Sequence, residues 1–425
     1  MTDERIDALV RRLDVSSEPD SAFVESSLVA LIPAAAHARR RDGQWLGRTR
    51  TRVRLAIVDL RGALAKPSMR PVALVVVLLM LLALFVALAG IGNRRPAPTG
   101  AEGPLIVSRA GELLAINVGT STATTILRAE TSIAGVSRSP DGRLVTFWTG
   151  VPGGNQLEIA NVDGTDQRRL AAGLTLSWTG CIDVWTADSR HLAAQVRESG
   201  RPAILVVDVA TGTASLLRPP DGTPECPLWS PDGLSIAFRN TSGGSRSLEV
   251  VGADGTGWRS IAGGADGLSV AGANSWSPDG VWIYFDAAQG GGNGIFRADA
   301  RTGALERLTD EALRAYAPAL SPDGSLVSFM AAAAGRPGAY DLYLMKADGS
   351  ELRLVLSGAI NDGWSGDGRW MLAEWQPPGG TSNGGLVIIA PEGGSPTTVL
   401  SFESPCSLIG TTRCLDGVGW GQPRP

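Results

Sequence analysis

The chain has 425 residues, which is enough for one large domain with additional segments. Its formal net charge is −4, so no global positive field is present that would attract nucleic acid. The 54 glycines outnumber the 38 lysines and arginines, and this balance is typical of an all-β body with many tight turns.

Residues 1–70 are predicted to form a helical cytoplasmic region. One short helix covers residues 3–13, and a second begins near Asp20 and continues to about Ala38. A basic stretch follows, with arginines at positions Arg39, Arg40, Arg41, Arg48, Arg50, Arg52 and Arg54. The favoured interpretation is a juxtamembrane segment that touches anionic lipid, and the alternative is a docking site for a cytoplasmic regulator.

Residues 71–92 are predicted to be a transmembrane helix. The segment has no charged residue, and Val72 to Ile91 is a run of twenty apolar or small residues. At about 1.5 Å per residue, such a helix spans roughly 30 Å, the thickness of the bilayer core. Basic residues are denser before this segment than after it, where Arg94 and Arg95 stand. The positive-inside rule therefore predicts a single-pass cell-membrane protein with a cytoplasmic N-terminus. Residues 93–103, rich in Pro and Gly, are predicted to be a linker.

From residue 104 onward, a short phrase recurs six times. Its fullest form is Trp-Ser-Pro-Asp-Gly followed by an alternating apolar run. The aspartates of the six copies, or their equivalents, are Asp141, Asp188, Asp232, Asp279, Asp323 and Asp367. Successive aspartates are 47, 44, 47, 44 and 44 residues apart. A fixed period in this range on β-rich units predicts a β-propeller over residues 104–425.

The repeated phrase has the residues that a type I turn prefers at each of its four positions. The six aspartates are therefore interpreted as structural turn residues rather than as calcium ligands. Ile283 and Phe285 illustrate the alternating strand that follows, and the Trp before each turn is interpreted as packing between blades. Two copies depart from the phrase: Ala187 and Ser189 replace Pro and Gly, and Gly366 replaces Pro. Looser turns are expected there.

The phrase, its strand and an Ala-Asp-Gly-Ser/Thr hairpin, as at Ala347–Ser350, together resemble the WD40-like "PD40" repeat. That repeat is typical of the periplasmic TolB β-propeller and of the propellers attached to prolyl oligopeptidase-type peptidases. The resemblance extends over residues 104–421. It implies an all-β propeller fold, and it does not identify a ligand.

The two ends of this region predict how the ring closes. Leu105–Ser108, Leu113–Asn117 and Thr124–Leu127 have the pattern of the second, third and fourth strands of a unit without a first strand. Gly417–Gly421 has the pattern of a first strand with nothing after it. Joining them removes an exposed sheet edge and gives seven blades. TolB itself has six blades, so six is the alternative.

The four cysteines are Cys181, Cys226, Cys406 and Cys414, all on one side of residues 71–92. This distribution predicts an oxidising compartment for the propeller. Cys181 and Cys226 lie at nearly equivalent places in adjacent repeats, and Cys406 and Cys414 lie in one insertion. Disulfides are predicted for both pairs.

No metal or cofactor site is predicted. The cysteines lack Cys-x-x-Cys spacing. The N-terminal architecture resembles that of anti-sigma factors, but it has only His37 and no cysteine, so their zinc motif is absent.

No catalytic residue is predicted either. One Gly-x-Ser-x-Gly match, Gly380–Gly384, lies in a glycine-rich loop without the helix that a nucleophile elbow requires. His37 and His191 are the two histidines, and the membrane segment separates them, which leaves little scope for histidine acid–base chemistry. The sequence thus predicts that the protein is not an enzyme. The loops at Gly290–Gly294 and Gly335–Ala339 are wide enough to line a binding face, but no role is assigned to them.

The expected function is a membrane-anchored extracytoplasmic propeller that binds an envelope or extracellular protein, peptide or glycan. The alternative is a transmembrane sensor in which residues 1–70 relay the state of the propeller to a cytoplasmic regulator. A propeller hydrolase or lyase that uses carboxylates is the third and least favoured hypothesis. No nucleic-acid partner is expected.

Overall fold

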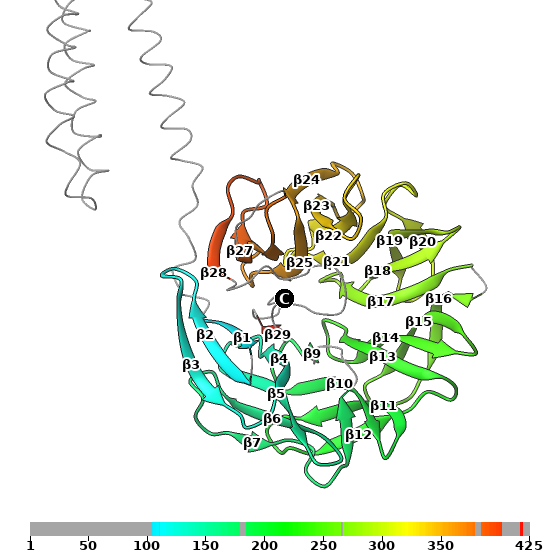
Figure 1. The fold of residues 1–425 in the computed structure, drawn as a ribbon. Coiled ribbons are helices and arrows are strands. Elements are labelled where there is room, and N and C mark those ends of the chain that lie inside the picture. The colour runs from blue at the N-terminus through cyan, green and yellow to red at the C-terminus, as the bar shows by residue number, and fades with distance from the viewer. Residues whose placement is uncertain are drawn as a thin grey trace, which may run out of the picture. The chain divides into compact units, whose positions relative to one another are not determined.

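A computed structural model describes residues 104–109, 111–178, 184–264, 267–378, 384–401 and 417–419. Within these ranges the chain is all β, and its sheets stand around a ring (Figure 1). The predicted helices of residues 1–70, the predicted transmembrane segment 71–92 and the linker 93–103 lie outside the described residues. Among the residues that are described, no helix is long and apolar enough to cross a bilayer.

Seven blades can be distinguished in the described ranges, each an antiparallel sheet whose strands run from the centre of the ring outward. Blade 1 combines β29 (Gly417–Gly419) with β1 (Leu105–Arg109), β2 (Glu112–Asn117) and β3 (Thr122–Arg128). Blade 2 contains β4 (Ile133–Arg138), β5 (Leu144–Val151), β6 (Gly154–Asn161) and β7 (Arg168–Arg169). Blade 3 contains β8 (Leu176–Trp178), β9 (Val184–Trp185), β10 (His191–Glu198), β11 (Arg201–Asp208) and β12 (Ala214–Leu217).

The remaining four blades each contain four strands in chain order. Blade 4 contains β13 (Thr223–Trp229), β14 (Ser235–Ser242), β15 (Ser245–Gly252) and β16 (Arg259–Gly263). Blade 5 contains β17 (Ser269–Trp276), β18 (Trp282–Gln289), β19 (Gly292–Asp299) and β20 (Leu305–Arg307). Blade 6 contains β21 (Ala315–Leu320), β22 (Leu326–Ala332), β23 (Tyr340–Lys346) and β24 (Arg353–Ser357). Blade 7 contains β25 (Ala359–Trp364), β26 (Met371–Trp375), β27 (Gly385–Ile389) and β28 (Thr397–Ser401).

Blade 1 closes the ring with strands from both ends of the propeller region. In it, β29 pairs antiparallel with β1, and Val418 stands opposite Val107. Buried residues of blade 1, such as Leu105, also pack with Leu372 and Leu386 of blade 7. The predicted closure and the predicted seven blades are therefore confirmed, and the six-bladed alternative is wrong.

The second and third blades share one continuous sheet. The short strand β8 pairs with β6 at Asn155 and with β10 at Val196. The outer strand of blade 2, β7, has only two residues and pairs with β6 only at Glu158 and Ile159. The edge of β6 at Asn155 is therefore available to pair with β8. Blade 3 has two short strands, β8 and β9, that both pair with β10, and the repeat pattern did not predict this pair.

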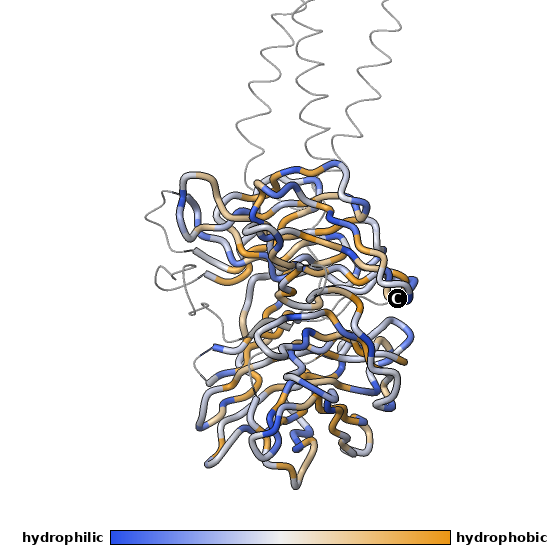
Figure 2. Tube along the Cα trace, turned by 90° about the vertical axis from the view of Figure 1, so that its right-hand side faces the viewer, coloured by the Kyte–Doolittle hydropathy of each residue, from blue (hydrophilic) through white to orange (hydrophobic). Residues whose placement is uncertain are grey.

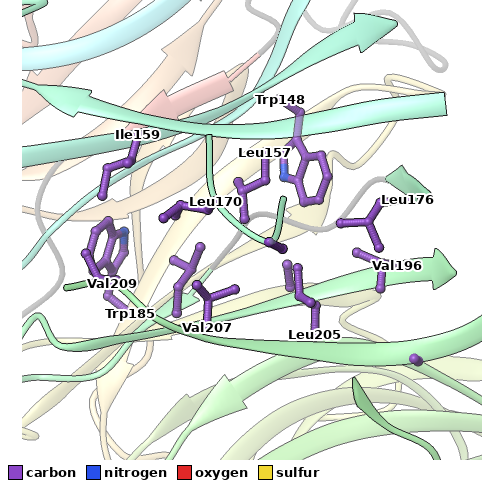
Figure 3. Packing of buried hydrophobic residues seen from close by; sticks show 14 residues of the cluster. Trp148, Leu157, Ile159, Leu170, Leu176, Trp185, Val196, Leu205, Val207 and Val209 are labelled. Carbon is purple, nitrogen blue, oxygen red and sulfur yellow. The ribbon is translucent and has the colours of Figure 1, made fainter. Parts of the chain in front are cut away.

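The side chains that hold the blades together lie between neighbouring sheets. Trp148 and Leu157 of blade 2 face Leu205 and Val207 of blade 3 across one such junction (Figure 3). Buried apolar residues occur in every blade, and Figure 2 shows hydrophobic segments spread through the domain rather than gathered in one layer. Full burial of a Leu, Val or Phe side chain stabilises by about 1.5–3 kcal/mol, so the junctions carry much of the stability of the ring.

The repeated phrase forms the turn between the first and second strands. In blade 5, the Gly280 N–H donates to the Ser277 carbonyl (2.9 Å), and the Ser277 hydroxyl donates to Asp279 Oδ1 (2.5 Å). The Trp282 N–H closes the turn by donating to Ser277 Oγ (2.8 Å). We call the end of the blades that carries these turns the turn end, and the end where the second and third strands connect the loop end.

The two departing copies have the same turn. The Ser189 N–H donates to the Thr186 carbonyl, and the Gly368 N–H donates to the Ser365 carbonyl, both at 2.9 Å. The expectation of looser turns at these sites is therefore wrong, because the bonds that define the turn come from the Ser or Thr and the Asp rather than from Pro. Ser189 adopts a φ of 62°, a region that glycine occupies more easily. Its hydroxyl in return accepts the N–H of Asp141 in blade 2 (3.1 Å).

Neighbouring turns approach each other closely. A Cβ atom at Gly324 of blade 6 would come within 2.8 Å of Pro278 Cδ in blade 5, and Gly324 has a φ of 73°. Both the backbone conformation and the space therefore require glycine there. The turns thus form a packed surface rather than free loops.

We expect Ala187→Pro to raise the free energy of unfolding by about 0.4–1 kcal/mol, because proline removes conformations from the unfolded chain alone. The residue has no positive φ, and the equivalent positions Pro231 and Pro278 accept proline. The change is measured as the shift in the unfolding midpoint of the full chain.

Two matched variants accompany this measurement. Gly366→Pro is expected to stabilise in the same way, because Gly366 has the same turn position and no positive φ. Ala193→Pro is expected to destabilise strongly, because Ala193 lies in the middle of β10, paired on both sides. Equal destabilisation by all three prolines would contradict the turn assignment.

Candidate functional site

The inner strands of five blades carry a β-bulge. The pairing register shifts in β4, β13, β17, β21 and β25. A bulge leaves one residue without a partner in its own sheet. In blades 4 and 6 the residues Cys226 and Ala317, each four positions before the first turn residue, have φ values of 52° and 50°. Their backbone amides therefore need acceptors from elsewhere.

The preceding blade supplies these acceptors. Gln195 Oε1 of blade 3 accepts the Cys226 N–H of blade 4 (3.0 Å). The Asp286 carboxylate of blade 5 accepts the Ala317 N–H of blade 6. Both side chains stand on the second strand, nine residues after the first turn residue. Arg239, at the same position in blade 4, instead donates to the Ala271 carbonyl of blade 5.

The same kind of contact continues into blade 7. Asn361 Nδ2 donates to the Ala317 carbonyl (3.2 Å), so the bulge residue of blade 6 binds both neighbouring blades. The indole of Trp364 donates to the Ala319 carbonyl (2.9 Å). Trp276 likewise donates to Leu228 of blade 4 (3.2 Å). We call this series of hydrogen bonds across the junctions of blades 3 to 7 the inter-blade belt.

An ion pair within blade 4 lies beside the belt. Glu225 Oε2 accepts from Arg239 Nε (2.8 Å) and from the Thr241 hydroxyl (2.8 Å). Burial alone would raise the pKa of Glu225, but the hydrogen bonds from Arg239 and Thr241 outweigh it and lower that pKa. Glu225 is therefore ionised at neutral pH, and it compensates the charge of Arg239.

Asp286 lies in the opposite electrostatic situation. It is 6% exposed, and burial raises its pKa to about 6, against the effect of the backbone amides and Arg239. The Asn274 amide lies beside this carboxylate, and with Nδ2 on the near side it can donate to Asp286 Oδ1 (3.0 Å) and to the Gly272 carbonyl (2.8 Å). Strongly shifted carboxyl groups gather at functional sites, so blades 4 to 6 of the belt form the candidate site.

The six aspartates singled out in the sequence lie elsewhere, at the turn end. Each accepts a hydrogen bond from the first residue of its own turn, as Asp232 does from Ser230 (2.5 Å). The hydroxyl of Ser230 and the amide of Leu234 lower the pKa of Asp232. These contacts keep the Asp232 carboxylate ionised and bound to its own turn. Its role is therefore to stabilise the backbone conformation of that turn.

The cysteines and His191 are only partly described. Cys226 is disulfide-bonded. Cys181, Cys406 and Cys414 lie outside the described residues, so the predicted pairing stays a prediction. His191 lies at the turn end, with Nε2 3.9 Å from Asp208 Oδ2 and its ring centroid 6.3 Å from that of Trp229. The Gly380–Gly384 motif also lies outside the described residues except for its last glycine.

The described ranges contain no group of three His, Cys, Asp or Glu residues arranged to hold a metal ion. A pocket of about 170 Å³ lies at the edge of blade 2 next to β8, between Asn155 and the segment from Arg169 to Leu176. Ligand pockets usually measure roughly 300–1,000 Å³, so this one fits at most a very small group.

Sequence reasoning missed Asp286, although a signal was available. The position nine residues after the first turn residue can be read in every repeat. Its occupants in chain order are Trp148, Gln195, Arg239, Asp286, Met330 and Glu374. A position that has the same place in each blade but changes between apolar, neutral polar and charged residues is a candidate for function rather than for packing alone.

Comparisons with known proteins agree with this fold. The family of the TolB beta propeller domain (PD40) matches residues 155–389, more than half of the chain. A curated relative is the uncharacterized protein Atu1656 of Agrobacterium fabrum, 29% identical over 194 residues, which are 43% of this chain and 61% of the relative. The match thus spans less than two thirds of the relative's length.

Solved structures with the same fold include enzymes. An oligogalacturonate lyase in complex with manganese has a TM-score of 0.55 at 17% identity, with 69% of this chain and 88% of the lyase covered. A puromycin hydrolase has a TM-score of 0.55 at 16% identity, with 72% of this chain and 54% of the hydrolase covered. At these identities the likeness shows the fold alone.

The inference that the protein is not an enzyme is therefore corrected. It depended on the absence of a catalytic motif and on the presence of only two histidines in the sequence. The lyase match covers most of an enzyme chain, so a propeller of this fold can itself form most of an enzyme. Missing sequence motifs do not exclude catalysis in this fold.

We expect Asp286→Asn to stabilise the protein increasingly as the pH rises from about 4 to about 7. The folded pKa of about 6 lies above the unfolded value of 3.8. The contribution of Asp286 to stability is thus fully present below the unfolded pKa and is lost as the pH rises through the folded pKa. At neutral pH, the free energy of unfolding of Asp286→Asn is expected to exceed that of the wild type by about 3 kcal/mol at most, because one pKa unit corresponds to ~1.4 kcal/mol. Unfolding midpoints at several pH values measure it.

The matched control is Asp279→Asn at the turn end. The hydrogen bonds from Ser277 and Val281 lower the pKa of Asp279, so its contribution is present above the unfolded pKa and is lost as the pH falls through the folded pKa. This variant is expected to lose stability at neutral pH and to approach the wild type in acid. A pH-independent effect of Asp286→Asn would contradict the assignment.

The repeat spacing, the seven antiparallel blades and the closure of the ring by β29 describe one architecture. The family match covers the repeats from blade 2 to blade 7 and supports the same conclusion from sequence. The chain therefore belongs to the TolB beta propeller domain (PD40) family.

Proposed function

We propose that this protein is a single-pass membrane protein that displays its propeller outside the cytoplasm and binds an envelope protein, peptide or glycan there. The charge-free run at residues 71–92 and the arginine-rich stretch before it support the anchoring and the orientation. The disulfide at Cys226 supports an oxidising compartment for the propeller. The family supports a binding role without naming the partner.

We propose that the partner binds at the loop end of blades 6 and 7. Binding residues lie preferentially on loops that a rigid scaffold positions, and the turn end is occupied by packed turns. In blades 2 to 5 the second and third strands are joined by two-residue connections, including Gly290–Gly291. In blade 6 the connection comprises residues 333–339 and includes Gly335–Ala339; in blade 7 it covers 376–384. This difference in loop length is the observation that carries the proposal.

The blade 6 connection is pre-organised. Its backbone is closed by the Ala333 N–H, which donates to the Ala339 carbonyl (2.9 Å). Arg336 pairs with Asp341 Oδ1 (2.5 Å), and the same oxygen accepts the Gly358 N–H from the connection to blade 7 (2.8 Å). A loop that is ordered before binding loses less conformational entropy when a partner is bound.

An aromatic pair stands beside this connection. The rings of Tyr316 and Tyr340 meet edge to face with centroids 5.8 Å apart, and both side chains are partly exposed. Tyrosines with fixed rings supply contact area at low entropic cost and a hydroxyl for hydrogen bonding. We propose that Tyr316, Tyr340 and Arg336 form the contact patch.

The test is a pull-down from the native membrane with three forms of the protein. These are the full-length chain, a variant lacking residues 1–70, and a Tyr316→Ala/Tyr340→Ala double variant. We expect an envelope partner with the first two forms and at least a tenfold loss with the double variant, because truncating binding anchors of about 2 kcal/mol or more has this effect. Leu354→Ala is the control, since Leu354 is 49% exposed on the outer strand of the same blade.

The outcomes separate the hypotheses. An envelope partner that the double variant retains would overturn the contact patch, and no envelope partner at all would overturn the binding role. A cytoplasmic regulator that is lost only without residues 1–70 would favour the transmembrane sensor. Because enzymes share this fold, the purified protein is also assayed for turnover of oligosaccharides and peptides.

A further inference from the structure

We propose that the turn end of blades 4 and 5 is a docking surface for a partner polypeptide segment that carries arginine and apolar side chains. The surface consists of Asp232 and Leu234 of blade 4 and of Asp279 and Val281 of blade 5, and we call it the turn-end patch. It lies at the opposite end of the blades from the contact patch at the loop end. The inference therefore does not rest on the proposed function.

Three other blades show which group the carboxylate of this turn binds. In blades 2, 3 and 7 the residue two positions after the turn aspartate is an arginine, namely Arg143, Arg190 and Arg369. In each blade the arginine Nε lies near Oδ2 of that aspartate, at 2.8, 3.7 and 3.7 Å respectively. Oδ1 accepts the hydroxyl of the first turn residue instead. In this turn, Oδ2 is therefore the oxygen that accepts a guanidinium group.

Blades 4 and 5 keep the carboxylate but not the arginine. Leu234 and Val281 stand at the arginine position. Oδ1 of Asp232 and of Asp279 accepts the turn serine hydroxyl (2.5 Å) and the N–H of Leu234 or Val281 (3.0 Å). These hydrogen bonds lower the pKa of both aspartates, and no cation among the described residues pairs with either. Both carboxylates are thus ionised, exposed and fixed in the turn, with Oδ2 available to a cation from a partner.

The two apolar side chains of the patch face solvent. Leu234 is 68% exposed, more than any other large apolar residue in the described ranges, and Val281 is 40% exposed. Polar residues occupy this position in the other repeats, where blade 6 has Ser325 and blades 2, 3 and 7 have arginine. Apolar side chains that stand exposed at equivalent sites of neighbouring blades indicate a surface that a partner covers.

The junction between these two turns is also open. A Cβ atom at Gly233, Gly324 or Gly368 would lie 3.5, 2.8 or 3.3 Å from the turn of the preceding blade. A Cβ atom at Gly280 of blade 5 would meet no atom within 4 Å. The close packing of neighbouring turns is therefore interrupted between blades 4 and 5. This is where the exposed apolar side chains stand, so a side chain of a partner can enter beside Gly280.

A segment with arginine and apolar side chains complements both features of the patch. Its guanidinium groups would bind Oδ2 of Asp232 and Asp279, as the chain's own arginines do in three other blades. Its apolar side chains, and the methylene stems of its arginines, would cover Leu234 and Val281. An exposed ion pair alone contributes little free energy, so the apolar contacts are needed for affinity, and the charges select a cationic segment over an acidic one.

The test uses a fluorescein-labelled peptide of alternating arginine and leucine as the probe. Its binding to the full-length protein in detergent is measured by fluorescence anisotropy, with empty micelles as the blank. We expect Leu234→Arg/Val281→Arg to weaken binding at least about tenfold, because the new arginines occupy Oδ2 of their own turns and the apolar contacts are lost. This double variant is expected to keep the unfolding midpoint of the wild type, because three blades carry arginine at this position.

Ser325→Arg is the matched control for the single variant Leu234→Arg, because both add one positive charge at the same turn position. In blade 6, Asp323 Oδ2 already accepts the Ser325 hydroxyl (2.8 Å), so this turn lies outside the patch. We expect Ser325→Arg to change the affinity less than about twofold. Should Leu234→Arg/Val281→Arg fold poorly, Leu234→Ser/Val281→Ser introduces the residue of blade 6 and is also expected to weaken binding.

Four outcomes overturn the inference. The wild type does not bind the peptide, or the double variant binds it as tightly as the wild type does. Ser325→Arg weakens binding as much as Leu234→Arg does, which would assign the binding to the general negative charge of the turn end. Finally, without peptide, the wild type sediments as a dimer and the double variant as a monomer, which would assign the patch to a second copy of this chain.

Discussion

The structure depends on a backbone amide that its own blade cannot satisfy. A bulge in the inner strand frees this amide, and leaving it buried without a partner would cost about 1–3 kcal/mol. The neighbouring blade supplies the acceptor, as Gln195 does for Cys226 and Asp286 does for Ala317. Blades 4 and 6 are thus incomplete without the blade before each of them, and these junctions are tied by polar contacts as well as by apolar packing.

The need for a contact with the neighbouring blade determines which position on the second strand makes it, but not which residue type occupies that position. Any acceptor of suitable length can bind the bulge amide. A donor is also possible at this position, because Arg239 donates to the Ala271 carbonyl of the next blade. Chemical differences between blades can therefore accumulate at this position without loss of the fold. Blades 4 to 6 show this result: an ion pair at Glu225 and Arg239 stands beside a carboxyl group with a raised pKa at Asp286. The repeat provides the scaffold, and its variable position provides the chemistry.

The sequence predicted the features that depend on local chemistry. The 44- and 47-residue period, with its turn phrase, predicted the blades, and the unpaired patterns near Leu105 and Gly417 predicted the closure. The prediction of loose turns at Ala187 failed because hydrogen bonds of Thr186 make that turn regardless of proline. The pairing of β8 with β6 was missed because it depends on the shortness of β7 in the preceding blade.

The candidate site was missed for a related reason. The environment of Asp286 is created by Arg239 and Ala317, which lie more than 30 residues away on either side, and no short motif encodes such a contact. The conclusion that the chain is not an enzyme had the same weakness, because it inferred chemistry from motifs. In a propeller, functional groups are assembled from several blades, so the relevant pattern is the comparison of one position across the repeats.

The closing strand has a consequence for how the protein is made. Val107 of β1 and Val418 of β29 are about 300 residues apart in the chain, and contacts of such separation form late because a long loop must first be closed. Until β29 has been synthesised and has paired with β1, the backbone groups on the inner edge of β1 are unpaired and can form hydrogen bonds with a strand of another chain. The propeller therefore lacks the inner strand of blade 1 until β29 has been synthesised. We therefore expect protection of that edge, by a chaperone or by fast docking of the neighbouring blades, to raise the yield of correctly closed protein.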